Sequence, residues 1–301
     1  MTYFVIGAGG FLGSTLVKYL QQQGEEVYYS KRSVGAGDSA NACALNITDA
    51  TQFTSVKAKP DVVINCASAL PDPYKVFNDP AYLEQLFSTN VLGGANIMNW
   101  AAAEKIPRVI NCSTLVVVGK PWPVPLKEGE KTYPKGGHVG YSASKLSQEL
   151  VMSSIAEANG LSLLHLRISA LYGPGMKAGG ILHKLIGQAA AKENINLTNG
   201  NRVSFDFLHV DDAVKAIAHL AKLDEWPEQV INLASGEEIT LMELAEVICE
   251  QTGCSKEKII NKDDPHFSSR AKVDISLLEK YLQGSGINTG LFRQKVKSVV
   301  E

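Results

Sequence analysis

The residues from Tyr3 to Gly13 read Tyr-Phe-Val-Ile-Gly-Ala-Gly-Gly-Phe-Leu-Gly. The apolar and aromatic residues predict a short buried strand, and the amphipathic run 11–23 that follows the glycines predicts a helix. A glycine turn between them leaves backbone N–H groups at the helix N-terminus free to face a phosphate, and it lets a pyrophosphate approach closely. The stretch therefore predicts a dinucleotide site; the alternative is an ordinary glycine-rich turn.

The composition excludes several classes of protein. The chain has 301 residues, enough for one large or two modest domains, and a net charge of −2 from mixed acidic and basic residues, so we expect no binding to nucleic acid or membrane. No apolar run is long enough to span a bilayer, and we expect no leader segment before the first strand. The number of cysteines is odd, and their spacing is not that of a metal site, which predicts reduced thiols in a cytoplasmic protein. The five cysteines are Cys43, Cys66, Cys112, Cys249 and Cys254.

Strands and helices alternate along the first part of the chain. This order predicts an α/β fold, a Rossmann-type doubly wound parallel sheet over residues 1–170, with a returning segment at 203–223. Residues 171–301 are expected to form mainly a smaller C-terminal α/β substrate lobe at the carboxyl edge of the sheet. The later strands are expected at 26–30, 42–45, 61–66, 108–113 and 161–168, the long helices at 81–104 and 141–159, and irregular segments at 67–80 and 120–140.

Two basic residues, Lys31 and Arg32, follow the second expected strand. In a dinucleotide-binding sheet the tip of this strand meets the adenosine ribose, where an acidic residue accepts hydrogen bonds from a free 2′-hydroxyl and basic residues suit a 2′-phosphate. The pair therefore predicts NADP(H), with NAD(H) as the alternative cofactor. A solvated basic turn without a ligand is the other interpretation.

Tyr141 and Lys145 are four residues apart at the start of an expected helix, so their side chains emerge on one face. An ammonium group beside a phenol lowers the phenol's pKa, which predicts that Tyr141 acts as a general acid or base near neutral pH. The spacing alone proves little, but the helix follows the fifth expected strand, which ends in Ser113 and Thr114. A hydroxyl there is placed to hydrogen-bond the same substrate oxygen that Tyr141 protonates.

Further motifs extend over almost the whole chain. They are Gly7-x-x-Gly10-x-x-Gly13, the strand Asp61–Ala67, Thr89-Asn90-Val91, Cys112-Ser113-Thr114 followed by Gly119, Tyr141-x-x-x-Lys145, Arg167 with Tyr172-Gly173-Pro174, Phe207–Asp212 and Ile231–Thr240. In this order and at these spacings the chain resembles the extended short-chain dehydrogenase/reductases, in particular their NAD(P)-dependent epimerase/dehydratase branch.

The resemblance implies roles for single residues. Thr114 would be the catalytic hydroxyl with Ser113 beside it, and Lys145 would also bond the nicotinamide ribose. Lys31 stands where NAD-preferring relatives have an acidic residue, and Asn46 stands where an aspartate that reads the adenine is commoner. The cofactor-binding residues would be Gly7, Gly10, Phe11, Leu12, Gly13, Lys31, Arg32, Asn46, Ile47, Cys66, Ala67, Ser68, Asn90, Ser113, Tyr141 and Lys145.

Two departures from the family pattern disfavour particular reactions. Family dehydratases carry an Asp-Glu pair after the catalytic threonine, but Leu115 and Val116 stand here and cannot transfer a proton. Relatives that epimerise next to a ketone use an additional Cys and His, and the matching positions hold Leu115 and Gly180.

The substrate is less well defined. An Asn and an Arg that commonly hold the diphosphate of a nucleotide-sugar align with Ala170 and Phe205. Arg270 and Arg202 are the candidate replacements, and a surface arginine without a ligand is the alternative for each, favoured slightly for Arg202. The substrate-binding residues are expected to be Ser113, Thr114, Tyr172, Phe205 and Arg270, although Tyr172 and Phe205 are aromatic residues of the kind that also fill cores. The histidines are too widely spaced for a metal site, and we expect no metal.

These observations predict an NADP(H)-preferring oxidoreductase that interconverts a ketone and a secondary alcohol, with a nucleotide-linked keto-sugar as the candidate substrate. A redox-neutral nucleotide-sugar 4-epimerase that retains its cofactor would use the same residues. A non-catalytic dinucleotide-binding protein is disfavoured because Thr114, Tyr141 and Lys145 are all present. By resemblance, the helices at 81–104 and 141–159 would pair with their copies in a homodimer.

Overall fold

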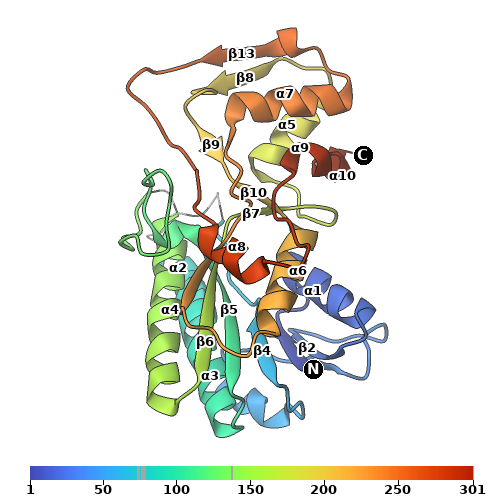
Figure 1. The fold of residues 1–301 in the computed structure, drawn as a ribbon, viewed down its shortest axis with the longest axis vertical. Coiled ribbons are helices and arrows are strands. Elements are labelled where there is room, and N and C mark those ends of the chain that lie inside the picture. The colour runs from blue at the N-terminus through green and yellow to red at the C-terminus, as the bar shows by residue number, and fades with distance from the viewer. Residues whose placement is uncertain (73–74, 76–78, 137, 301) are drawn as a thin grey trace. The chain divides into compact units, whose positions relative to one another are not determined.

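The computed structural model describes residues 1–72, 75, 79–136 and 138–300 (Figure 1), so parts of the expected irregular segments 67–80 and 120–140 lie outside the described residues. The chain forms two compact units. The first comprises residues 1–119, 131–168 and 214–231, and the second comprises residues 120–130, 169–213 and 232–301. The segment that returns to the first unit is therefore 214–231 rather than the expected 203–223.

A seven-stranded sheet forms the centre of the first unit, in the order β11-β6-β5-β4-β1-β2-β3. Parallel pairing joins the strands from β3 to β6, and Tyr3 of β1 lies opposite both Val27 and Val62. The chain order reverses between β1 and β4, which is where sheets of this kind bind ligands, and the predicted Rossmann-type fold is confirmed. The strands are β1 (Thr2–Ile6), β2 (Glu26–Lys31), β3 (Ala42–Ala44), β4 (Val62–Asn65), β5 (Arg108–Thr114), β6 (Ser162–Ile168) and β11 (Val230–Leu233).

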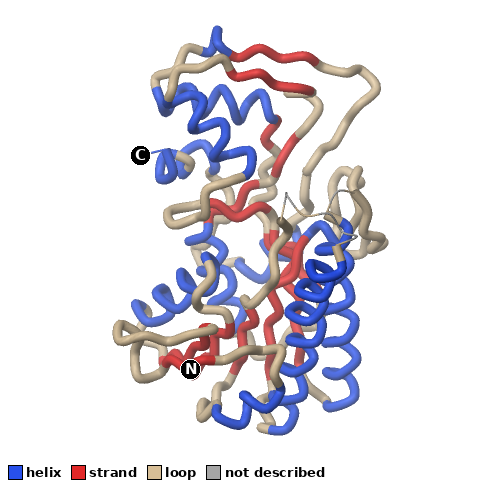
Figure 2. Tube along the Cα trace, turned by 180° about the vertical axis from the view of Figure 1, so that it is seen from behind, coloured by secondary structure: helices blue, strands red, loops and turns tan. Residues whose placement is uncertain are grey.

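Helices cover both faces of this sheet. Figure 1 shows α3 (Gly93–Ala103) and α4 (Val139–Asn159) on one side and α1 (Phe11–Gln22) and α6 (Val210–Ala221) on the other. Seen from behind in Figure 2, the strands of the first unit again lie between helices. Side chains such as Phe4 and Val109 from the strands pack with Ile97 of α3 and Met152 of α4. The buried apolar strands thus find cover on both sides, as a parallel sheet requires.

The expected helix at 81–104 is divided into α2 (Pro80–Phe87), a π-helical turn η2 (Ser88–Leu92) and α3. Glycines at the start of α3 allow close packing: a Cβ on Gly93 would lie 2.6 Å from Ile47 Cδ1, and one on Gly94 would lie 3.1 Å from Gln148 Cγ. The wide turn carries Asn90 at the same place, and such turns are frequent at functional sites. A 3₁₀ helix, η1 (Ala50–Ser55), follows β3.

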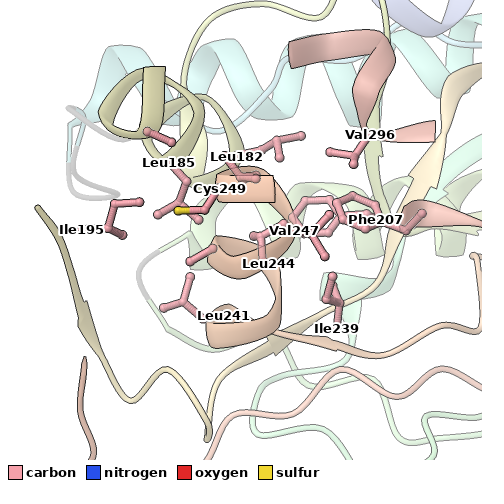
Figure 3. Packing of buried hydrophobic residues seen from close by; sticks show 14 of the residues in the cluster. Leu182, Leu185, Ile195, Phe207, Ile239, Leu241, Leu244, Val247, Cys249 and Val296 are labelled. Atoms are coloured by element: carbon pink, nitrogen blue, oxygen red, sulfur yellow. The ribbon is translucent and has the colours of Figure 1, made fainter. Parts of the chain in front are cut away.

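The second unit has its own hydrophobic core. Leu185 of α5, Leu244 and Val247 of α7 and Phe207 of β10 meet in one buried cluster (Figure 3). Short strand pairs flank it: β7 (Ala170–Tyr172) with β10 (Phe207–His209), β8 (Ile195–Thr198) with β13 (Ile259–Lys262), and β9 (Ser204–Phe205) with β12 (Ile239–Thr240). Its helices include α5 (Gly180–Ala190), α7 (Leu241–Thr252), α8 (Ser276–Leu282), α9 (Phe292–Lys295) and α10 (Lys297–Val300).

None of the helices in the described residues is long and apolar enough to cross a membrane.

Candidate active site

The glycine turn between β1 and α1 is shaped by close backbone contacts. Gly7 has a φ of +86°, and a Cβ there would lie 2.6 Å from the Ala67 nitrogen; a Cβ on Gly13 would overlap the Gly7 carbonyl oxygen. The Gly7 and Ala8 N–H groups donate to the Ser30 carbonyl, at 3.2 and 2.9 Å. Gly10 caps α1 without any side-chain bond to its first N–H groups. The turn is a cradle at a helix N-terminus whose one side chain is the Ala8 methyl group, and it fits the pyrophosphate of a dinucleotide.

The tip of β2 is less cationic than the sequence predicts. The Lys31 ammonium is paired with the Asp38 carboxylate, which hydrogen bonding to Lys31 holds at a pKa below its usual value. Arg32 is exposed. The charge of Lys31 is therefore already opposed within the chain, by an acidic residue seven positions further along the sequence.

The two residues expected at the adenine differ in their surroundings. Asn46 is exposed, and its side-chain oxygen accepts hydrogen bonds from the Thr48 N–H and hydroxyl, at 3.2 and 3.0 Å. Ile47 is buried, and its carbonyl accepts a 2.9 Å hydrogen bond from the Asn96 amide. The Asn46 side chain thus shapes its own loop, while Ile47 ties that loop to α3.

Asn90 holds the segment that follows β4. Its side-chain oxygen accepts from the Ala69 N–H at 2.8 Å and the Ser68 hydroxyl at 3.1 Å, while its amide donates to the Ala69 carbonyl and the Ser144 hydroxyl. Asn90 is fully buried, and these bonds use its amide completely. Direct contact with a cofactor was expected, but the geometry makes Asn90 a positioning residue for Ser68 and for α4.

Tyr141 lies in a cluster of hydroxyl groups. Its side chain hydrogen-bonds with Thr114 and Ser68 and packs against Ala69 and Tyr82. Burial raises the pKa of Tyr141 to about 12, and the hydrogen bonds with Thr114 and Ser68 only partly oppose this effect. Tyr141 and Thr114 are thus brought together as the sequence predicts, and Ser68, expected only at the cofactor, joins them.

Lys145 is buried one helical turn beyond Tyr141. Its ammonium donates to the Cys112 carbonyl at 2.8 Å and to the side-chain oxygen of Gln148. Burial lowers the pKa of Lys145 to about 8. The expectation that Lys145 lowers the pKa of Tyr141 is therefore wrong for this structure, because desolvation dominates at the phenol and the ammonium faces other groups.

Ser113 and Thr114 point to opposite faces of β5, as successive strand residues do. The Ser113 hydroxyl donates to the Glu149 carboxylate, which also accepts from Arg167: Nη2 lies 2.8 Å from Oε2 and Nε 3.2 Å from Oε1. These three side chains are buried. Ser113 was expected to contact both substrate and cofactor, but its hydroxyl belongs to this ion-pair cluster, and Thr114 is the hydroxyl beside Tyr141.

A buried amide network lies next to Lys145. Asn65 donates to the Asn111 side-chain oxygen at 2.9 Å, and Asn111 donates to Gln148 at 3.3 Å and shares a 3.1 Å bond with His165 Nδ1. Gln148 in turn donates to the Asn90 carbonyl at 2.7 Å. The sequence analysis did not single out Asn65, Asn111 or Gln148. The sequence feature that could have identified them is the presence of polar side chains in the strands and on the sheet-facing side of α4, where apolar residues are the rule.

Cys66 and Cys112 follow the two asparagines in the sequence, and their sulfur atoms lie 3.7 Å apart. Hydrogen bonding to Cys112 and burial raise the pKa of Cys66, so the thiol is protonated at neutral pH. All five cysteines are free thiols.

The residues expected to bind substrate in the second unit have other surroundings. Tyr172 is only 1% exposed and packs among the rings of Phe207, His209 and Phe292, so it is a core residue rather than part of a substrate pocket. Phe205 is partly buried against Phe207. The Arg270 side chain is 52% exposed and is paired with Glu238, with 2.8 Å between Nε and Oε1. Of these three residues, Arg270 alone presents a charged group on the surface.

The second unit also contains a cavity of about 890 Å³, lined by residues 235–237, 272–276 and 286–290 among others. None of the predicted site residues lines it. The residues that the structure describes contain no cluster of three or more metal-ligating side chains.

A family model described as the NAD dependent epimerase/dehydratase family matches residues 3–234. The chain belongs to this family. The resemblance read from the motifs is confirmed, and with it a nicotinamide-dependent enzyme class. The specific reaction varies among the relatives.

The chain is 27% identical over 287 residues to Protein CapI of Staphylococcus aureus, covering 84% of each. It is 23% identical over 299 residues to a dTDP-4-dehydro-6-deoxy-D-allose reductase of a Streptomyces species, covering 93% of this chain and 90% of the other. Its fold matches the crystal structure of a Thermus thermophilus UDP-glucose 4-epimerase in complex with NAD, with a TM-score of 0.77, 21% identity and coverage of 100% and 98%.

Proposed function

We propose that this protein is an NAD(P)(H)-dependent oxidoreductase that reduces a ketone of a nucleotide-linked keto-sugar to a secondary alcohol. The observation that carries the proposal is the hydrogen-bonded cluster of Tyr141, Thr114 and Ser68, with Lys145 on the next turn of α4. The cluster lies in the unit that contains the glycine cradle. The names of relatives, which include a reductase of a dTDP-linked keto-sugar, support the substrate class.

The bound nicotinamide would supply the hydride. A pKa of about 12 keeps the Tyr141 phenol protonated at neutral pH, which is the form that a general acid needs. Thr114 and Ser68 hold the phenol and mark the place where a carbonyl oxygen would accept its proton. The buried Lys145 ammonium would bind the nicotinamide ribose from the same helix, in addition to its bonds with Cys112 and Gln148.

A redox-neutral 4-epimerase is the second candidate. The structural likeness to a UDP-glucose 4-epimerase that binds NAD favours it, and so does the pairing of Lys31 with Asp38, which weakens the argument for a consumed NADPH. A tightly retained cofactor without net turnover would distinguish the epimerase from the reductase. The NADP(H) preference expected from Lys31 and Arg32 is opposed by this pairing, and comparing the dissociation constants of NADH and NADPH tests it separately.

A homodimer in the cytoplasm completes the proposal. Large apolar side chains are exposed on the helices expected to pair: Phe87 is 38%, Leu92 49% and Leu150 64% exposed. Their burial against a second copy would remove apolar surface from water. The free thiols support a reducing compartment.

The proposal is tested by following NADH and NADPH consumption against a panel of nucleotide-linked 4-keto-sugars. The Tyr141→Phe variant, which lacks the acidic hydroxyl, should lose roughly 100- to 10,000-fold in kcat/KM. Tyr133→Phe is the matched control, because Tyr133 is exposed on the same unit and should keep full activity. Undiminished turnover by Tyr141→Phe would exclude the mechanism.

A further inference from the structure

Asp38 is an acidic residue fixed beside the end of β2. Its carboxylate accepts hydrogen bonds from the Lys31 ammonium, from the Tyr29 hydroxyl at 3.4 Å and from the Gly35 N–H at 3.0 Å. The Tyr29 hydroxyl is itself held by a 3.1 Å bond from the Ser39 N–H. Only 14% of the Asp38 side chain is exposed. The loop after β2 is therefore built to present one carboxylate to one lysine.

This ion pair lies against the glycine cradle. A Cβ on Gly9 would lie 3.9 Å from Lys31 Cγ, and the Ser30 carbonyl binds the Gly7 and Ala8 N–H groups. In this fold the position is that of the adenosine ribose. The net charge at the end of β2 is +1, because Asp38 offsets one of the two positive charges of Lys31 and Arg32.

We propose that Asp38 determines the choice between NAD(H) and NADP(H), an inference that rests on the proposed dinucleotide function. Its carboxylate forms an ion pair with the Lys31 ammonium and places a negative charge next to the ribose 2′ position. A 2′-phosphate must then approach a fixed anion and compete for the lysine, whereas a free 2′-hydroxyl meets a hydrogen-bond acceptor. Asp38 thus lowers the affinity for NADP(H) relative to NAD(H).

The experiment measures dissociation constants of NADH and NADPH by fluorescence titration of the full chain, without substrate. The variants are Asp38→Asn, Lys31→Met and the double variant. Asp224→Asn is the control for net charge, since the neighbouring Leu223 carbonyl binds Arg108 at the opposite, amino end of the sheet. Asp38→Ser is a second variant that removes the charge but keeps a polar group. The melting temperature of each variant shows whether it is folded.

Asp38→Asn should lower the dissociation constant of NADPH about tenfold and change that of NADH less than about twofold, because one charge is removed close to the 2′-phosphate. The gain should shrink as salt is added. Lys31→Met alone leaves the Asp38 carboxylate without its partner, so it should raise the dissociation constant of NADPH about as much as Asp38→Asn lowers it. The double variant should bind NADPH about as wild type does, because it loses one charge of each sign.

Two results would overturn the inference: a folded Asp38→Asn or Asp38→Ser protein with an unchanged ratio of the two constants, or a double variant that keeps the full NADPH gain of Asp38→Asn. Binding of neither cofactor to the wild-type chain would instead contradict the proposed function. The two failures are thereby distinguished.

Discussion

At the scale of single residues, burial controls the two ionisable groups of the candidate site. It raises the pKa of Tyr141 to about 12 and lowers that of Lys145 to about 8. In each case the neutral form is favoured over the charged one. The pair is therefore set for protonation of a ketone oxygen at neutral pH, while deprotonation of an alcohol by Tyr141 would gain from a higher pH.

The shifted pKa of Lys145 predicts a pH-dependent stability. Between about pH 8 and the ordinary lysine pKa of 10.5 the unfolded chain binds the proton and the folded chain does not, so this residue makes stability rise with pH in that window. Below about pH 8 the folded chain must bury the charge. The margin, meaning the melting temperature of Lys145→Met minus that of wild type, should therefore fall between pH 8 and 10.

Both chains contain the same other titratable groups, so the contribution of those groups to the pH dependence cancels in the difference between the two melting temperatures. A margin that stays constant or widens over this range would contradict the lowered pKa of Lys145. The margin need not be positive at every pH, because the variant also loses the hydrogen bonds to Cys112 and Gln148.

At the scale of elements, the Glu149–Arg167 ion pair connects α4 to β6 and, through Ser113, to β5. Its side chains are only 6% and 7% exposed. Removing one partner leaves a buried charge, so Glu149→Gln and Arg167→Met should each lower the free energy of unfolding by about 3–5 kcal/mol. Denaturant unfolding of the two variants measures this loss.

The double variant Glu149→Leu with Arg167→Met should be more stable than either single variant, because no charge then remains unpaired. Glu250→Gln provides the control: it breaks the pair with Lys256, whose side chains are about half exposed, and should change stability little. Equal effects of Glu149→Gln and Glu250→Gln would contradict the importance of burial.

The sequence predicted most elements of the first unit because its strands are apolar runs bounded by glycine, proline and charge. It failed where tertiary contacts decide the local structure. The helix at 81–104 contains no residue that forces a break before Gly93, and its π-helical turn is fixed by the bonds of Asn90 to Ala69 and Gln148. β11 is a four-residue run that becomes a strand by pairing beside β6.

The site was predictable to a similar degree. The spacing of the glycines predicted the cradle, and the four-residue spacing of Tyr141 and Lys145 predicted that they share one helix face. These two features were predictable because each depends only on local geometry. The partners of Lys31, Ser113 and Tyr172 were not predictable, since Asp38, Glu149 and the ring of Phe292 come from other segments. Each of these partners changes the role that the residue alone suggests.

At the scale of the whole molecule, the exposed apolar side chains predict self-association. Leu150→Glu should convert the expected dimer into a monomer, because a carboxylate on this face of α4 would be desolvated at the interface. Light scattering measures the mass directly. Val34→Glu, an exposed site on the loop after β2, should leave the mass unchanged. A monomeric wild-type chain would contradict the dimer.

The central claim is that this chain transfers a hydride between a nicotinamide cofactor and a sugar carbon, with Tyr141 as the acid. It is tested most directly with NADH or NADPH deuterated at C4 of the nicotinamide, on the face that donates hydride, and a nucleotide-linked 4-keto-sugar, followed by mass spectrometry of the sugar product. We predict an alcohol one mass unit heavier than that formed with unlabelled cofactor, and little product from Tyr141→Phe. An alcohol without deuterium, or equal amounts of labelled alcohol from wild type and Tyr141→Phe, would contradict the account.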